Sequence, residues 1–165
     1  MTERAYVALG ANLGATLEAN RATLNAAIDA IAALPATGVV TRSSFYRTAP
    51  LGYTDQPDFV NAVIGIDTAI APSALLLALH DIEDRFGRVR SIRDAPRTLD
   101  LDLLCYGERV IATATLEVPH PRLHERAFVL APLAEIARDL AIPGQGRVDQ
   151  LLARLPDQGI ERLPP

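Results

Sequence analysis

Hydrophobic and polar positions in the first half of the chain follow a pattern that predicts strands and helices in turn. Residues 6–9 form a short apolar run, and a helical face of leucines and isoleucines follows between Leu17 and Ile31. Residues 39–46 are rich in β-branched side chains, which favours a second strand. Residues 59–67 alternate, so we expect a third strand with one apolar face and with Phe59 and Asn61 on the other.

The second half begins with a helix and a further strand. Pro72 opens an apolar helical pattern that stops at Gly87. Residues 99–106 alternate again, with Leu99, Leu101, Leu103 and Cys105 predicted on one face and Asp100, Asp102, Leu104 and Tyr106 on the other. Two weaker helical patterns, 128–137 and 148–155, complete the chain.

The order β-α-β-β-α-β indicates the split βαβ arrangement of a ferredoxin-like α+β fold. We expect two helices to cover one face of an antiparallel sheet, which leaves the other face or its edge loops to bind a ligand. No repeat or long linker divides the sequence, so residues 1–165 are interpreted as a single domain with extra C-terminal elements.

Composition narrows the possible functions. A net charge of −4 and a pI near 5.3 argue against a general nucleic-acid or membrane binder. With a single cysteine, no charged and apolar leader and no long apolar run, we expect a cytoplasmic protein, and a monomer. All 16 basic residues are arginines, which excludes mechanisms that need a catalytic or phosphate-binding lysine.

The sequence PRTLDLDLL at 96–104 contains the clearest chemical signal. Asp100 and Asp102 are two apart in a predicted strand, so both carboxylates point the same way. Paired oxygen ligands suit Mg²⁺, which takes phosphate oxygens and water as its other ligands. The alternative is the solvated face of an amphipathic strand, because alternation alone often produces such pairs.

The adjoining segment favours the functional interpretation. Residues 85–97 contain five arginines and one acid, directly before the aspartate pair. A metal with arginines around it can neutralise a polyphosphate during transfer. The alternative is a solubilising loop or a patch of ion pairs.

Other candidates are weaker by themselves. GANLG at 10–14 is best interpreted as a tight turn and helix start, although helix amides there could hold an anion. Phe59 beside Asn61 could bind a flat heterocycle, while Phe59 alone is the kind of residue that more often belongs to a core. His120 lies in a proline-flanked loop, where a polar ring is more often functional, and Cys105 is predicted to be a buried, inert thiol.

Taken together, five segments resemble the 6-hydroxymethyl-7,8-dihydropterin pyrophosphokinase family of folate biosynthesis over almost the whole chain. They are ALGANLG (8–14), SSFYRTAPLGYTDQPDFVNAV (43–63), GRVR (87–90), PRTLDLDLL (96–104) and VPHPRLHERAFVLAPLAEIA (118–137). The resemblance implies a ferredoxin-like core and transfer of pyrophosphate from ATP to the pterin's hydroxymethyl group. It implies two Mg²⁺ ions and the release of AMP.

The resemblance also assigns roles to individual residues. It implies that Asp100 and Asp102 are metal ligands, and that Arg88 and Arg97 contact the ATP phosphates and assist transfer. The pterin is expected between the rings of Phe59 and Phe128, with Asn61 reading its edge and the backbone of Thr48 and Leu51 completing the pocket. The expected ATP-site residues are Glu83, His120 and Arg126.

The sequence departs from the family's pattern at a few positions. Many members have a tryptophan just before the proline-arginine pair, where this chain has Asp94 and Ala95. Thr115 and Glu117 stand where some relatives have an arginine and a threonine near the nucleotide. Two other hypotheses stay open from the sequence: a non-catalytic ferredoxin-like module that binds a nucleotide or metabolite, and a metal-dependent phosphohydrolase.

Overall fold

The structure is a computed structural model that describes residues 1–49, 57–87 and 99–165. Its strands are β1 (Glu3–Ala11), β2 (Thr37–Arg42), β3 (Tyr46–Thr48), β4 (Phe59–Thr68), β5 (Asp100–Tyr106), β6 (Ile111–Ala112), β7 (Glu117–Val118), β8 (Ala141–Ile142), β9 (Gly146–Arg147) and β10 (Glu161–Arg162). Its helices are α1 (Leu17–Ala32), α2 (Pro72–Arg85), the short 3-10 helix η1 (Leu123–Glu125), α3 (Ala127–Ala137) and α4 (Val148–Ala153).

The main sheet runs β10-β3-β4-β1-β5, with β2 pairing to the far part of β4. All of its pairs are antiparallel. The predicted ferredoxin-like arrangement is confirmed, because β1, α1, β2, β4, α2 and β5 follow one another in the expected order. This topology places β1 between the two strands that carry the candidate polar residues.

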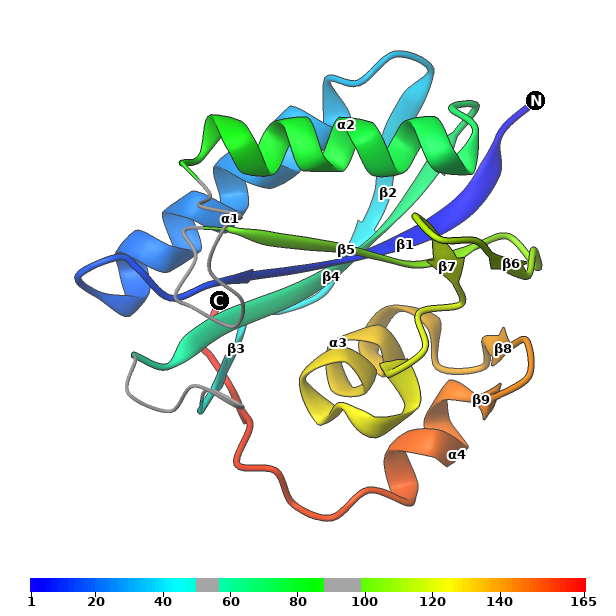
Figure 1. The fold of residues 1–165 in the computed structure, drawn as a ribbon. Coiled ribbons are helices and arrows are strands. Elements are labelled where there is room, and N and C mark those ends of the chain that lie inside the picture. The colour runs from blue at the N-terminus through cyan, green and yellow to red at the C-terminus, as the bar shows by residue number, and fades with distance from the viewer. Residues whose placement is uncertain (50–56, 88–98) are drawn as a thin grey trace.

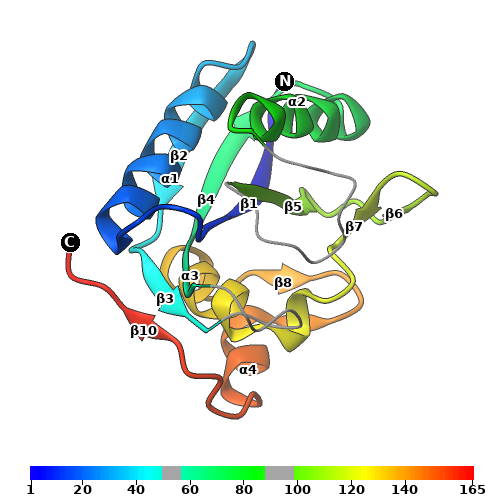
Figure 2. The ribbon, with the colours of Figure 1, turned by 60° about the vertical axis from the view of Figure 1, so that its left-hand side comes forward.

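Helices α1 and α2 lie side by side on one face of the sheet (Figures 1 and 2). Thr16 caps α1, because its hydroxyl accepts the amide of Ala19 at 3.1 Å. The core beneath the helices contains the predicted apolar face of β4, namely Val60, Ala62, Ile64 and Ile66. The alternation of β4 is therefore confirmed.

The opposite face of the sheet is covered for much of its length by α3, and α4 packs against α3 (Figure 1). Val63 of β4 is buried there with Leu130 and Leu133 of α3 and Leu151 of α4. The face available to a ligand is thus narrower than the sequence suggested. It is confined to the sheet end near Asn61 and Asp100.

The predicted strand at residues 39–46 is wrong in one respect, since it is two strands with a break at residues 43–45. At the break the Ser43 hydroxyl accepts the amide of Val63 at 2.9 Å, which replaces a backbone contact of the ladder. A polar side chain that bonds to the backbone in this way competes with regular strand pairing.

Strand β5 contains a β-bulge that the alternation did not predict. Val7 pairs with Leu103 and Tyr6 pairs with Cys105, so Leu104 has no opposite residue on β1. Beyond the bulge, Cys105 joins the α3 side of the sheet and Tyr106 joins the α1 and α2 side. The predicted faces of these two residues are therefore wrong, while Asp100 and Asp102 precede the bulge and keep theirs.

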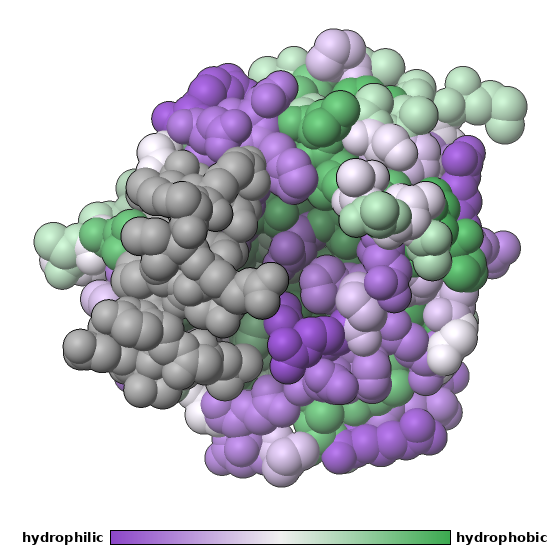
Figure 3. All heavy atoms as spheres, in the orientation of Figure 1, coloured by the Kyte–Doolittle hydropathy of each residue, from purple (hydrophilic) through white to green (hydrophobic). Residues whose placement is uncertain are grey.

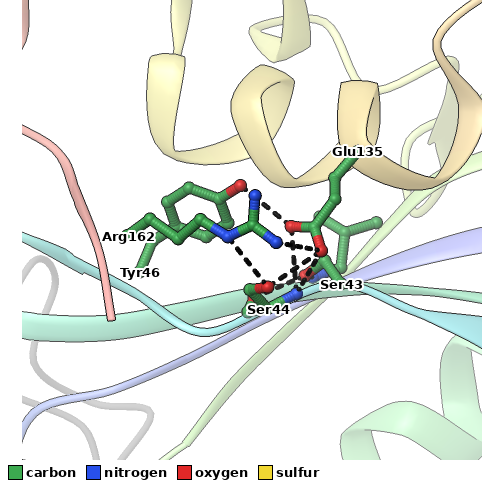
Figure 4. A network of polar contacts seen from close by, with 6 residues as sticks. Ser43, Ser44, Tyr46, Glu135 and Arg162 are labelled. Carbon is green, nitrogen blue, oxygen red and sulfur yellow. Dashed lines mark hydrogen bonds and ion pairs between the residues drawn. The ribbon is translucent and has the colours of Figure 1, made fainter. Parts of the chain in front are cut away.

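Helix α3 is joined to the sheet edge through Glu135 (Figure 4). Its carboxylate accepts hydrogen bonds from the Ser44 amide at 3.0 Å and from the Tyr46 hydroxyl at 2.9 Å. It also accepts from Arg162 of β10 at 3.3 Å. Burial and then the bond to Glu135 raise the pKa of Tyr46 to about 12. One carboxylate thus connects α3, β3 and β10.

Candidate active site

Three residues opposite one another form a row across β4, β1 and β5, near one end of the sheet. Gly10 on β1 pairs with Asn61 on β4 and with Asp100 on β5. Directly opposed residues of antiparallel strands point to the same face. Phe59 and Asn61 therefore lie on one side of Gly10, and the aspartate pair lies on the other. Figure 3 shows a recess near the middle of one face of the molecule, with hydrophilic residues along its wall.

Asn61 is held firmly within this row. It is 5% exposed, and its amide Nδ2 donates to the Thr48 hydroxyl at 2.8 Å. Phe59, two residues earlier and opposite Thr48, is half-buried. A Cβ placed on Gly10 would be 3.0 Å from Asn61 Oδ1 and 3.7 Å from Phe59 Cδ1, so both side chains adjoin the same glycine. The shared face predicted for Phe59 and Asn61 is confirmed.

Asp100 and Asp102 are half-buried on the face that does not contact α1 and α2. Between them, the amide of Leu101 donates to Glu83 Oε2 of α2 at 2.8 Å. Among the described residues, no group of three or more histidine, cysteine or acidic side chains could enclose a metal ion. Two carboxylates suffice for Mg²⁺ when phosphates and water supply the other ligands, so this donor set fits that ion.

The start of α3 brings a cation to the carboxylates. Arg126 is the N-cap residue of α3, and its guanidinium carbon lies 5.5 Å from the ring centre of Phe128. Burial lowers the pKa of Arg126, while the charges of Asp102 and Asp100 raise it. The guanidinium therefore lies within electrostatic reach of both aspartates. Within the described part of the chain, its buried Nε has no hydrogen-bond partner.

His120 is fixed through its backbone. Its amide donates to the Leu104 carbonyl at 2.8 Å, at the bulge of β5, and its carbonyl accepts from Gln145 Nε2 at 3.1 Å. Burial lowers the pKa of its imidazole to about 4, with the charge of Arg126 acting in the same direction. The ring is therefore neutral at pH 7, and its Nδ1 accepts the Arg122 amide at 3.2 Å.

Apart from His120, the predicted site residues that the structure describes fall into three groups. Thr48, Phe59 and Asn61 on β3 and β4 adjoin one another, and Asp100 and Asp102 are coupled by charge to Arg126 beside Phe128. Glu83 is 1% exposed and contacts the backbone of β5 from the α2 side. Arg88, Arg97 and Leu51 lie outside the described residues.

Sequence reasoning missed the position of Gly10 and the role of Asn12. Gly10 belongs to β1 rather than to a turn. Asn12 is fully buried and donates from Nδ2 to the Pro57 carbonyl at 3.1 Å, so it anchors the chain two residues before β4. The Gly14 amide donates a hydrogen bond to Asn20 Oδ1 at 2.8 Å, which fits the turn interpretation of GANLG. The sequence feature that could have indicated the role of Asn12 is an asparagine directly after an apolar strand.

No helix within the described residues has the length and apolar character needed to cross a membrane. Cys105 is buried, and burial raises the pKa of its thiol to about 12, as expected for an inert cysteine.

Solved structures show the same fold. The Plasmodium falciparum HPPK-DHPS protein crystallised with pteroate superposes with a TM-score of 0.71 at 12% identity, over 93% of this chain. Wild-type HPPK-DHPS of the same organism gives a TM-score of 0.69 at 12% identity, again over 93% of this chain. This chain spans 42% and 45% of the length of those two proteins.

Sequence relatives extend over nearly the full length. The Pseudomonas aeruginosa 2-amino-4-hydroxy-6-hydroxymethyldihydropteridine pyrophosphokinase is 49% identical over 99% of both chains. The Haemophilus influenzae protein of that name is 46% identical over 98% of both. The sequence model of the 7,8-dihydro-6-hydroxymethylpterin-pyrophosphokinase family matches residues 6–138. With this match and these relatives, the chain belongs to the 7,8-dihydro-6-hydroxymethylpterin-pyrophosphokinase family.

Proposed function

We propose that this protein transfers pyrophosphate from ATP to the hydroxymethyl group of 6-hydroxymethyl-7,8-dihydropterin, a step of folate biosynthesis. The products are AMP and the pterin diphosphate. Family membership over residues 6–138 supports the reaction. The main structural support is the row of Asn61, Gly10 and Asp100. On one side of β1 it places an amide that can bind a heterocycle, and on the other side it places carboxylates that can bind a metal.

The pterin occupies the side formed by β3, β4 and the start of α3. Asn61 offers an amide to the edge of the ring while Thr48 fixes the orientation of that amide. Phe59 and Phe128 stack on the two faces of the ring, and the backbone of Thr48 and Leu51 completes the pocket. Both rings are half-buried, which leaves apolar surface for a flat ligand.

Asp100 and Asp102 hold Mg²⁺, which supplies charge neutralisation on the triphosphate when bound, and we propose two ions. Arg126 and His120 line the ATP side. Arg126 has a buried Nε without a partner among the described residues, and a guanidinium suits phosphate oxygens. His120 is neutral at pH 7, so its imidazole can accept or donate one hydrogen bond without adding charge. Glu83 belongs to the ATP side as well, where its carboxylate accepts the Leu101 amide between the two aspartates of β5.

Arg88 and Arg97 are proposed to contact the phosphates and assist transfer. They lie outside the described residues, so the support for their roles is the resemblance of GRVR and PRTLDLDLL to the family's segments. With no lysine anywhere in the chain, guanidinium groups are the side-chain cations available to the triphosphate at neutral pH.

The transfer itself needs positioning more than covalent catalysis. The hydroxymethyl oxygen forms a bond to the β-phosphorus while the bond from that phosphorus to the oxygen bridging to the α-phosphorus breaks, so AMP leaves with that oxygen. The hydroxymethyl proton is released to solvent or to a neighbouring oxygen. The rigid strands β1, β4 and β5 hold acceptor and donor at a fixed separation.

We further propose that the protein is a cytoplasmic monomer with residues 1–165 as one domain, and that it does not bind nucleic acid. The net charge of −4 supports the absence of nucleic-acid binding.

The deciding experiment follows the nucleotide product. We expect AMP to form from ATP only when Mg²⁺ and hydroxymethyl-dihydropterin are both present. ADP as the product, or hydrolysis of ATP without pterin, contradicts the proposal and favours a phosphohydrolase. Tight binding of both substrates in calorimetry without any product favours the non-catalytic binding module.

A further inference from the structure

Strand β1 carries no side chain where the two halves of the candidate site adjoin. Gly10 is opposite Asn61 on one neighbour and Asp100 on the other. Two residues earlier, Ala8 is opposite Val63 and Asp102 and contributes only a methyl group. At these two positions β1 therefore places only a hydrogen and a methyl group between the Asn61 amide and the two carboxylates.

Backbone conformation does not explain the glycine. Gly10 is not among the residues with a positive φ, so its strand geometry is accessible to any amino acid. The constraint is spatial, because an added Cβ would be 3.0 Å from Asn61 Oδ1. Carbon and oxygen at that distance are closer than normal packing permits, so the amide would have to move.

Asn61 has little room to move away. Thr48 lies on the side of β4 opposite β1, and the Asn61 Nδ2 to Thr48 Oγ1 distance is already 2.8 Å. Thr48 is 4% exposed. A Cβ at Gly10 would therefore press the amide toward a buried partner or turn it out of its hydrogen bond.

We propose that Gly10 is a positioning residue for the pterin, acting through Asn61. Its missing side chain keeps the Asn61 amide in the orientation that the Thr48 hydrogen bond sets. This inference rests on the proposed function, in which Asn61 and Phe59 bind the pterin.

The test compares Gly10→Ala with Gly38→Ala. Gly38 lies in β2, and a Cβ there would meet nothing within 4 Å, so it controls for a glycine-to-alanine change in a strand. For Gly10→Ala we expect the KM for pterin to rise about fivefold or more, since overpacking at a fixed contact carries that cost. The KM for ATP should stay within about twofold, and Gly38→Ala should match the parent protein in both. An unchanged pterin KM, or an equal rise in both KM values, overturns the proposal.

A double-mutant cycle with Asn61→Ala isolates the contact. Once the amide is removed, Gly10→Ala should add less than about twofold to the pterin KM, because the added Cβ no longer meets the oxygen. If Gly10→Ala alone unfolds at the assay temperature, the double variant should fold, because removing the Asn61 amide also removes the steric contact with the added Cβ. Full additivity, or failure of the double variant to fold, overturns the proposal.

The single variant Asn61→Ala separates this inference from the proposed function. If Asn61→Ala raises the pterin KM while Gly10→Ala leaves it unchanged, only the role of Gly10 is wrong. If Asn61→Ala leaves the pterin KM unchanged, the proposed pterin pocket is wrong, and the role of Gly10 falls with it.

Discussion

The carboxylate of Glu83 accepts the amide of Leu101 at 2.8 Å, at the residue that separates Asp100 from Asp102. In the main sheet, as far as the structure describes it, β5 pairs with β1 alone. At Leu101 the Glu83 carboxylate supplies the acceptor that a strand on the other side would otherwise provide. The two aspartates are thus held from behind by a side chain that is 1% exposed.

We expect Glu83→Leu to weaken Mg²⁺-dependent activity, because the buried Leu101 amide loses its acceptor. Leaving that amide unsatisfied costs roughly 2 kcal/mol of unfolding free energy. Glu83→Gln is the matched control, since its amide oxygen can accept the same bond. The measurement is the Mg²⁺ concentration for half-maximal AMP release, together with urea unfolding. Equal Mg²⁺ dependence in both variants would contradict the anchoring role.

Asp102→Ala should abolish turnover, by roughly a hundredfold or more, because it removes one of the two proposed metal ligands. Asp67→Ala is a suitable control, since Asp67 lies at the far end of β4 in a surface ion pair with Arg4. AMP release measures activity and far-ultraviolet circular dichroism checks the fold. Near-normal activity of the Asp102 variant would remove the metal role from the aspartate pair.

Stability should fall in mildly acidic solution in part because of His120. Its pKa is lowered to about 4 in the folded protein, against 6.5 in an ordinary histidine. The unfolded chain therefore binds the proton more readily between these values, and the unfolding free energy decreases as the pH drops from about 6.5 to about 4. His120→Asn should show a shallower pH dependence in urea unfolding across this window. An unchanged slope would show that the imidazole is not held neutral by its burial.

Glu135→Ala should destabilise the protein, because Ser44, Tyr46 and Arg162 all donate to the lost carboxylate. We expect a decrease of about 2 kcal/mol in unfolding free energy, the order of a hydrogen-bonded charged group. Glu18→Ala is the control, as Glu18 forms a 4.0 Å surface pair with Arg21 and should cost less than about 1 kcal/mol. Thermal unfolding compares the two. Equal melting temperatures would contradict a structural role for the Glu135 contacts.

Much of the fold was predictable because alternation and helix-start signals act within short windows. The apolar face of β4 and the proline at the start of α2 are local features, and both were confirmed. The shared face of Asp100 and Asp102 follows from period two alone, and it survived because the bulge comes after both residues.

The remaining features depend on contacts between distant segments. The bond from Glu83 to Leu101 needs the packing of α2 against an edge strand, which no local pattern encodes. Likewise, Arg126 comes near Asp102 because α3 covers the second face of the sheet, and in the sequence only the family resemblance assigns both residues to one site. The break at Ser43 arises because a serine hydroxyl bonds to a strand that follows much later in the chain.

The bulge at Leu104 makes β5 sensitive to changes in length. Its carbonyl accepts the His120 amide, and the carboxylates precede it on the same strand. Deleting Leu104 would restore strict alternation and leave Cys105 and Tyr106 on their present faces, because these two residues already pair in order with Tyr6 and Ala5. It would, however, remove the carbonyl that accepts the His120 amide in the loop that leads to α3. Substitutions can therefore accumulate along this strand far more easily than insertions or deletions, so any variant library should hold the spacing from Asp102 to His120 fixed.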